Sequence, residues 1–368
     1  MSLSEMLRPV TYDHLPGWTA DEGISEAFAA FSRSACQAAT RPYRTGGLGI
    51  AFESFAAAYA QARSGKPSAR PGEAREFFEQ HFLPFQVRPD AGGRGLVTGY
   101  YEPEAEASRV RSERFLVPLY RRPDDLVDVD DENRPQGLDP YFAFARRSGD
   151  SLEPYWDREA IDRGALQGRG LELCWLADRV DTFFIHVQGA ARLCLLEGGQ
   201  IRVTYAAKSG HRFTGIGRVL ADLGEIPLEK VSMQTIRAWL NRNPQRQDEI
   251  LWRNRSYIFF RETQLGDLAL GPVAAAKVQL QPARSIAVDH TLHTFGTPFF
   301  VHAPELRHVD GAPFRRLMIA QDTGSAITGT ARGDLFIGTG VAAGEIAGTI
   351  RHPADFYVLL PKSLVAGA

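Results

Sequence analysis

The chain has 368 residues, which predicts two domains or one large one. Hydrophobic residues make up 44% of it and charged residues 23%, values typical of a globular protein with a core of ordinary size. Its 42 basic and 44 acidic residues nearly balance. This argues against nucleic acid as a partner, because nucleic-acid-binding proteins usually carry a clear basic excess. No stretch approaches the ~18 apolar residues that a membrane-spanning helix needs.

The N-terminal part is predicted to be helical. Apolar residues recur at helical spacing in two stretches of residues 21–64. A third helical stretch, 73–81, follows a break rich in Pro, Gly and Ser. From about residue 95 to residue 120 the sequence is strand-like, whereas residues 121–150 are polar and acidic. The latter composition predicts an excursion at the surface.

The central part is predicted to alternate between short strands and helices. Residues 155–180 indicate a helix, a glycine-rich turn and a short apolar run. The expected strands are 183–187, 192–196 and 201–205, and the expected helices are 215–223 and 233–241. Ser232 is the predicted N-cap of the second helix.

After residue 266 almost every apolar stretch is of the β type and is bounded by glycines. The expected strands cover residues 274–280, 284–289, 297–303, 315–322, 333–340, 344–350 and 355–361. Many short strands at regular spacing predict a barrel or a sandwich. The predicted fold class is therefore mainly β with helices.

Three aspartates follow or open strands in this region, namely Asp289, Asp322 and Asp334. An aspartate at the end of an apolar strand lies where the sheet meets solvent, and glycines such as Gly324 let the backbone approach a ligand. A carboxyl group that burial or a like charge keeps protonated can act as the acid in cleaving a glycosidic bond. Each aspartate taken singly also fits an ordinary turn residue. The spacing does not decide which of them would be protonated.

Two further motifs suit a carbohydrate site. Their members are Thr98, Gly99, Tyr100 and Tyr101 in the first, and Gln188, Lys208 and His211 in the second. Tyrosines offer flat apolar faces with a polar rim, and the polar side chains of the second motif can hydrogen-bond sugar hydroxyls, carboxylates or peptide. Half-buried strand tyrosines and ordinary turn residues are the alternatives.

Together the motifs resemble those of one family, the membrane-bound lytic murein transglycosylases A, whose C-terminal segment is called the three-aspartate domain. The matching segments, in chain order, are 98–103, 183–193, 203–220, 233–240, 256–260, 284–298, 317–348 and 358–362. Each segment alone is modestly specific, but their common order is strongly specific.

The resemblance implies a particular two-domain fold. Residues 1–103 and 267–368 would form a double-psi β-barrel domain with N-terminal helices. Residues 104–266 would form a second, smaller β-rich domain inserted into it, with a large groove between the two domains for the glycan.

The resemblance also implies an enzyme that degrades peptidoglycan. It would cleave the β-1,4 bond between N-acetylmuramic acid and N-acetylglucosamine without hydrolysis, leaving 1,6-anhydromuramic acid. Asp334 matches the catalytic aspartate, which serves as acid and then as base, while Asp322 and Asp289 match the two that shape and polarise the site. Glycan strands are the implied partner of a monomer, and no metal or cofactor is implied.

Three other interpretations stay open. A barrel of this kind could bind carbohydrate, here peptidoglycan, without activity. The turn at Asp322 resembles that of aspartic proteases, although those enzymes need two such turns and this chain has one. A hydrolase with two carboxylates is the third alternative.

Features near the N-terminus leave the location of the protein open. Residues 1–18 lack the apolar core and cleavage site of a signal peptide, so we expect either a cytosolic protein or a targeting segment absent from this sequence. The substrate implies a periplasmic setting. Association with the outer membrane would need a processed N-terminal anchor, and Cys36, inside a predicted helix, does not suit one. Cys174 and Cys194 are expected to be ordinary buried thiols.

Overall fold

The computed structural model describes residues 3–65, 70–90 and 92–365. It divides into two compact units, Met1–Tyr101 with Gly266–Ala368, and Glu102–Leu265. Both units combine mixed sheets with helices, which confirms the predicted α+β class. Within these residues no helix reaches the length and apolar character needed to cross a membrane.

The first unit is built on an eight-stranded sheet. Its strands are β1 (Leu7–Pro9), β2 (Phe82–Val87), β3 (Gly95–Glu102), β13 (Ser285–Ala287), β14 (Pro298–Ala303), β15 (Phe314–Asp322), β16 (Arg332–Thr339) and β17 (Arg351–Pro361). They pair in the order β1-β2-β17-β14-β15-β13-β16-β3, and β17 also pairs with β3. Because β3, the last strand in this order, pairs back with β17, the strands from β17 to β3 form a nearly closed barrel, as the sequence predicted.

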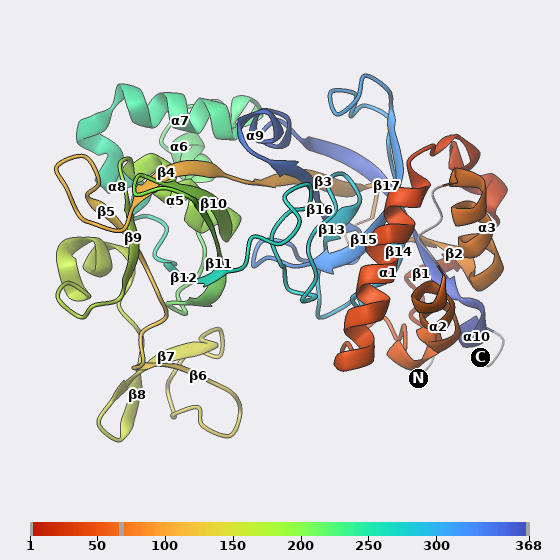
Figure 1. Ribbon diagram of the computed structural model, residues 1–368, viewed down its shortest axis with the longest axis horizontal. Helices are drawn as coiled ribbons and strands as arrows, with labels where there is room; N and C mark the ends of the chain where they lie inside the picture. Colours follow the sequence, from red (N-terminus) through yellow and green to blue (C-terminus); the bar gives the residue numbers. More distant parts are fainter. Residues whose placement is uncertain (1–2, 66–69, 91, 366–368) are drawn as a thin grey trace. The chain divides into compact units, whose positions relative to one another are not determined.

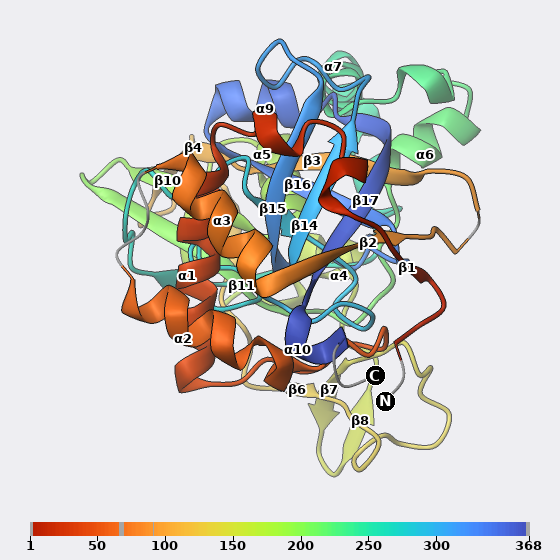
Figure 2. The same cartoon turned by 90° about the vertical axis from the view of Figure 1, so that its right-hand side faces the viewer.

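Helices cover one side of this sheet, as Figure 1 and Figure 2 show. They are α1 (Ile24–Thr40), α2 (Ala56–Ser64) and α3 (Pro71–His81), and the unit also holds α9 (Val341–Ala347) and α10 (Lys362–Val365). Phe28 and Phe31 lie one turn apart on the buried face of α1 and contact the rings of Phe77 and Phe78 on α3. The predicted amphipathic helices are thus confirmed.

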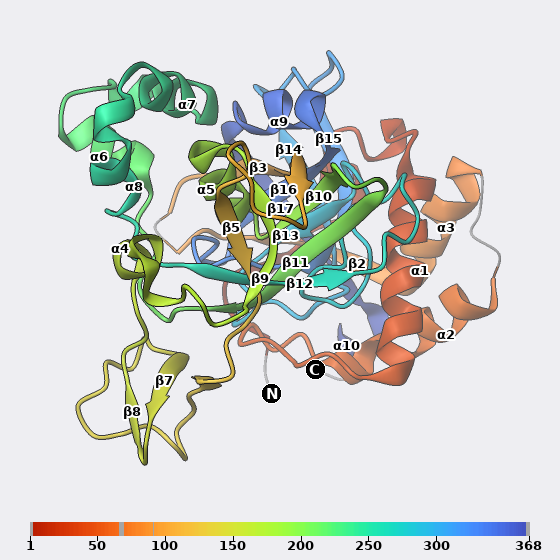
Figure 3. The same cartoon turned by 60° about the vertical axis from the view of Figure 1, so that its left-hand side comes forward.

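The second unit contains a six-stranded and a three-stranded sheet. The larger has the order β12-β11-β10-β4-β9-β5, and β6, β7 and β8 form the smaller. Bounds of the strands are β4 (Glu104–Ser108), β5 (Val117–Tyr120), β6 (Leu126–Asp128), β7 (Phe144–Ser148), β8 (Ser151–Glu153), β9 (Glu172–Leu176), β10 (Ala190–Leu195), β11 (Gln200–Lys208) and β12 (Ile258–Thr263). Figure 3 shows the small sheet standing apart from the other elements of this unit.

The helices of the second unit are α4 (Arg158–Ala160), α5 (Arg179–Gln188), α6 (Ile216–Asp222), α7 (Met233–Arg242) and α8 (Gln247–Leu251). A π-helical turn, Ile161–Ala165, follows α4 directly. Ser232 caps α7 as predicted: its side chain accepts from the Thr235 amide, and the Thr235 hydroxyl oxygen accepts from the Ser232 amide.

Three predicted strands are wrong. Residues 183–187 belong to α5, which begins after the N-cap Asp178 and ends before Gly189, whose φ is 75°. Residues 344–350 lie mostly in α9, an alanine-rich segment with high helix propensity. The chain reverses at Lys277 (φ 62°), so that residues 274–280 form a loop.

The cysteines are only partly as expected. Cys174 is buried and its burial raises the pKa of the thiol to about 12, so it is an inert thiol. Cys194 is half-buried and Cys36 is exposed, and all three are free thiols.

A buried ion pair lies at the start of the second unit. Glu102 accepts two hydrogen bonds from Arg202 on β11, at 2.6 and 2.9 Å, and both side chains are at most 1% exposed. Arg192 on β10 lies 3.6 Å from the same carboxylate. A carboxylate with no solvent access needs such bidentate partners to stay charged.

Candidate active site

The barrel strands bring Asp322 and Asp334 onto one face of the sheet. Ala287 on β13 pairs with Asp322 on β15 and with Asp334 on β16, so the two aspartates flank β13 at the same level. Side chains at directly opposed positions point to the same face, and two strand spacings separate their Cα atoms by about 10 Å. The sheet register therefore joins two of the three predicted aspartates in one site.

Asp334 has a short polar chain behind it. The Thr98 hydroxyl on β3 donates to Asp334 Oδ1 at 2.5 Å, and Arg332 Nη2 donates to the same hydroxyl oxygen at 2.7 Å. A second guanidinium nitrogen of Arg332 donates to the Gly333 carbonyl at 2.5 Å. Because a guanidinium can only donate, the Thr98 oxygen accepts from Arg332, and the single hydroxyl proton of Thr98 is directed at the carboxyl of Asp334.

Desolvation dominates the protonation of Asp334. It raises the pKa of this carboxyl above its usual range, and the positive charge of Arg332 and the Thr98 hydrogen bond only partly offset the effect. Burial in turn lowers the pKa of Arg332 from its ordinary value. A half-buried carboxyl whose desolvation outweighs a single side-chain donor is suited to hold a proton.

Asp322 has more donors than Asp334. The Tyr100 hydroxyl donates to Asp322 Oδ2 at 2.9 Å, and the Ala275 amide donates to Oδ1 at 3.2 Å. The Thr323 amide is a third donor. Desolvation raises the pKa of Asp322, with a smaller contribution from the charge of Asp334, while these donors oppose the rise. Of the two, Asp322 is thus better equipped to carry the negative charge.

Asp289 has a different environment from the other two. It accepts from the Thr291 hydroxyl at 2.6 Å, the Thr291 amide at 3.0 Å and the Gly329 amide at 2.9 Å. Burial alone would raise its pKa, but these hydrogen bonds lower it below the usual value. Through the bond to the Gly329 amide, Asp289 fixes the loop that precedes β16. Gly329 itself has φ 107°, a conformation that favours glycine. Gly324 lies exposed in the same loop.

The first motif divides between the site and the core. Thr98 and Tyr100 point to the two aspartates, as described. Tyr101 is buried, and a side chain at Gly344 on α9 would collide with its ring. A side chain at Gly99 would lie 2.8 Å from Ile350 and 2.9 Å from the Ala347 carbonyl, so this glycine lets β3 pass close to the end of α9.

The second motif lies in the second unit. Gln188 ends α5. The Lys208 ammonium lies 5.0 Å from the centre of the Tyr141 ring, which Arg212 covers at 4.2 Å. His211 is buried, and its Nε2 lies 2.7 Å from the Tyr155 carbonyl. This bond ties the loop after β11 to the segment before α4.

Comparisons with known proteins place this fold. Residues 96–261 match the MltA specific insert domain, and residues 284–360 match the 3D domain. The crystal structure of a membrane-bound lytic murein transglycosylase from Agrobacterium tumefaciens is 49% identical, with a TM-score of 0.91 over 98% of either chain. The chain belongs to the membrane-bound lytic murein transglycosylase A family.

Other members of the family agree with this placement. MltA from Neisseria gonorrhoeae, in its monoclinic crystal form, is 34% identical, with a TM-score of 0.78 over 96% of this chain and 92% of that chain. The membrane-bound lytic murein transglycosylase A of Escherichia coli K12 is 30% identical over 275 residues, which cover 73% of this chain and 67% of that protein.

In this member of the family, Arg332 is the site residue that sequence reasoning missed. The available signal was its spacing, because residues two apart in a strand share a face and Arg332 precedes Asp334 by two. As for metals, no group of three or more His, Cys, Asp and Glu side chains in the described part of the chain could hold one.

Proposed function

We propose that this protein is a peptidoglycan lytic transglycosylase in which Asp334 acts first as acid and then as base. The observation that carries the proposal is the environment of Asp334. Desolvation raises the pKa of its carboxyl, and among the described side chains only Thr98 donates a hydrogen bond to this carboxyl. Membership of a family of lytic murein transglycosylases supports the same assignment. The proposed substrate is the bond between N-acetylmuramic acid and the following N-acetylglucosamine.

Each proton has a defined path in the proposed reaction. Asp334 gives its proton to the glycosidic oxygen as the bond from that oxygen to C1 of the muramic acid breaks. The C6 hydroxyl oxygen of the same sugar then bonds to C1, and its proton passes to the carboxylate of Asp334. No water is consumed, and Asp334 ends protonated, ready for the next cycle. Because the nucleophile belongs to the substrate, proximity replaces a second catalytic carboxylate.

The neighbouring groups have supporting roles in this proposal. Asp322, which lies on the same face and has more hydrogen-bond donors, would in its ionised form stabilise positive charge that develops at C1. Thr98 and Arg332 position Asp334, and Asp289 and Gly324 shape the adjoining loop. We propose the two compact units as the barrel and insert domains, and the cell envelope, where peptidoglycan lies, as the place of action.

Product chemistry tests this function. Purified murein sacculi digested by the protein are expected to release anhydromuropeptides, each one water lighter than the hydrolysed form, as detected by mass spectrometry. Products with a reducing end would instead indicate a hydrolase with a second carboxylate. No release, on sacculi that a control muramidase digests, would leave binding as the function.

The pH dependence of the reaction tests the role of Arg332. Its charge lowers the pKa of Asp334, so Arg332→Gln should raise that pKa further and keep the acid protonated to higher pH. The alkaline limb of the kcat/KM profile is expected to move up by about one pH unit. Arg315→Gln, an exposed arginine on β15, is the matched control. An alkaline limb that stays in place in the Arg332 variant contradicts this role.

A further inference from the structure

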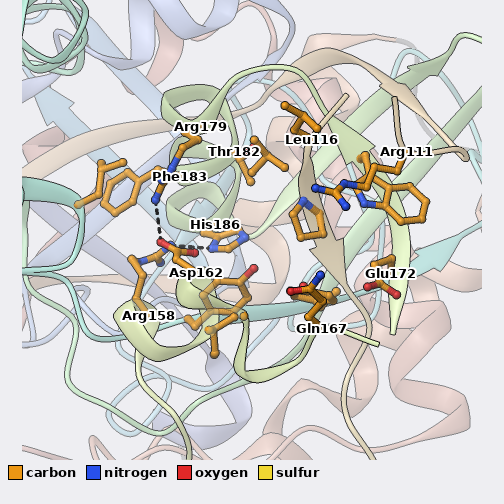
Figure 4. Close-up of a pocket in the computed structure, with 18 residues that line it drawn as sticks. Arg111, Leu116, Arg158, Asp162, Gln167, Glu172, Arg179, Thr182, Phe183 and His186 are labelled. Atoms are coloured by element: carbon orange, nitrogen blue, oxygen red, sulfur yellow. Dashed lines mark hydrogen bonds and ion pairs between the residues drawn. The ribbon is translucent and has the colours of Figure 1, made fainter. Parts of the chain in front are cut away.

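A cavity of about 360 Å³ lies within the second unit, where the proposed reaction uses no residue (Figure 4). Helix α5, the π-helical turn Ile161–Ala165 and strands β5 and β9 line it. Its volume falls within the range of small-ligand pockets.

The face of α5 toward the cavity is polar. Arg179, Thr182, Phe183 and His186 are spaced as one helical face, and all four line the cavity. A helix face that only completed a core would be apolar. Arg179 is paired with Asp162 and the Thr182 hydroxyl donates to the Asp178 carbonyl, so His186 is the polar group of this face that packing does not account for.

Arg158 is a buried cation without a carboxylate in contact. It is 3% exposed and lies between the rings of Phe183 and Tyr257. Its guanidinium donates to the Asn254 and Ser256 carbonyls at 3.0 and 2.6 Å, and no carboxylate among the described residues forms an ion pair with it. Burial lowers the pKa of Arg158 and the charge of Asp162 opposes this only in part, so an anion nearer the guanidinium would stabilise it further.

His186 presents an unused donor at the cavity wall. Arg158 Nη1 lies 3.1 Å from His186 Nδ1, and since a guanidinium can only donate, Nδ1 accepts and the proton is on Nε2. Burial and the charge of Arg158 hold the pKa of His186 well below its usual value, so the ring is neutral. Its Nε2 is buried and has no hydrogen-bond partner in the described structure.

The other charged side chains of the wall differ in how far they are already paired. Arg179 lies 3.2 Å from Asp162, which also accepts from the Trp252 indole at 3.0 Å. Arg111 is exposed and makes no ion pair with a described carboxylate, and Figure 4 shows it with Glu172 across the cavity from Arg158. Arg179 also pairs with Asp248 at 2.7 Å, so two carboxylates already offset its charge, and Arg111 is the cationic side chain that the cavity offers to an anion.

We propose that this cavity binds the terminal carboxylate of a short peptide. The carboxylate would accept from Arg111 and, after a small shift of the ring, from His186 Nε2, near the charge of Arg158. Glu172 and Gln167 on the wall would accept from peptide N–H groups, and the Trp175 and Tyr120 rings would contact small side chains. The choice of a D-alanine peptide as the probe rests on the proposed function, because the stem peptides of peptidoglycan end in D-alanine. The assignment of the pocket as a carboxylate site does not rest on that function.

Calorimetric titration of the whole protein with D-alanyl-D-alanine tests this site. Saturable binding is expected, at least about tenfold weaker for the dipeptide amide, which lacks the negative charge. Arg111→Gln should weaken binding about fivefold. Arg114→Gln, which removes an exposed arginine paired with Glu106, should leave binding unchanged. Asp334→Asn should also leave it unchanged, so that failure of this proposal is separate from failure of the proposed function.

Three results of these titrations would overturn the proposed site. No saturable binding, equal binding of the amide, or an unaffected Arg111 variant would overturn the site. L-Alanyl-L-alanine distinguishes the source of the peptide. A preference for the D form assigns it to peptidoglycan, and equal binding assigns it to peptides in general. Either of these two results supports the carboxylate site.

Discussion

Replacing Asp334 by Asn is expected to lower the release of anhydromuropeptides from murein sacculi by about a thousandfold or more. The amide cannot give a proton to the leaving oxygen or take one from the C6 hydroxyl, so both proposed steps lose their catalyst. The change is nearly isosteric, and the amide oxygen can still accept from the Thr98 hydroxyl, which now lies 2.5 Å from Oδ1. Product release followed by mass spectrometry over a time course gives the ratio of rates.

Asp322→Asn is the matched control for this prediction. It removes a carboxylate on the same face of the sheet, which accepts from the Tyr100 hydroxyl and two backbone amides and is not the acid in the proposed reaction. We expect a loss of about tenfold, because electrostatic support is weakened while the acid remains. If Asp334→Asn kept a tenth of the wild-type rate in a folded protein, Asp334 would not be the acid. If Asp322→Asn were inactive while Asp334→Asn kept a rate close to that of the wild type, Asp322 would be assigned as the acid.

Sequence patterns predicted the elements whose signals are local. The helical spacing of Phe28 and Phe31 in α1 and the β-type runs of β14, β15 and β17 were sufficient. The segment 183–187 was mistaken for a strand because a short apolar run has no period that separates a buried strand from a buried helix. Asp178 and Gly189, which cap α5, bracket a helix-length segment and were the overlooked signal.

The site was predictable as a set of residue types but not as an arrangement. The three aspartates stand out in the sequence, yet which of them lie on one face of the sheet depends on strand pairing between residues far apart in the chain. Ala287 joins Asp322 and Asp334 through the sheet register, whereas Asp289 is bound by its own loop. The cavity beside α5 could not be predicted, because Arg158 and His186 meet only through tertiary packing.

Removing the charge of Glu102 is expected to give the largest loss of stability. Glu102 and Arg202 are almost completely buried and share two hydrogen bonds, and Arg192 lies 3.6 Å from the same carboxylate. Glu102→Gln would leave the Arg202 guanidinium without its counter-charge in a site that water does not reach, while Arg192 would keep Glu104 as a partner. The free energy of unfolding should fall by about 3–5 kcal/mol, measured by urea denaturation with intact secondary structure checked by circular dichroism.

Glu104→Gln is the control for this effect, since its carboxylate is 39% exposed and 3.3 Å from Arg192, and water can replace the interaction. A change of less than about 1 kcal/mol is expected there. The double variant Glu102→Leu with Arg202→Met should recover much of the lost stability, because it removes both buried charges together. If it is instead as unstable as Glu102→Gln, packing rather than an uncompensated charge would be the cause. Since Glu102 ends the strand that carries Thr98 and Tyr100, the outcome also shows how far one motif combines a structural anchor with groups of the proposed active site.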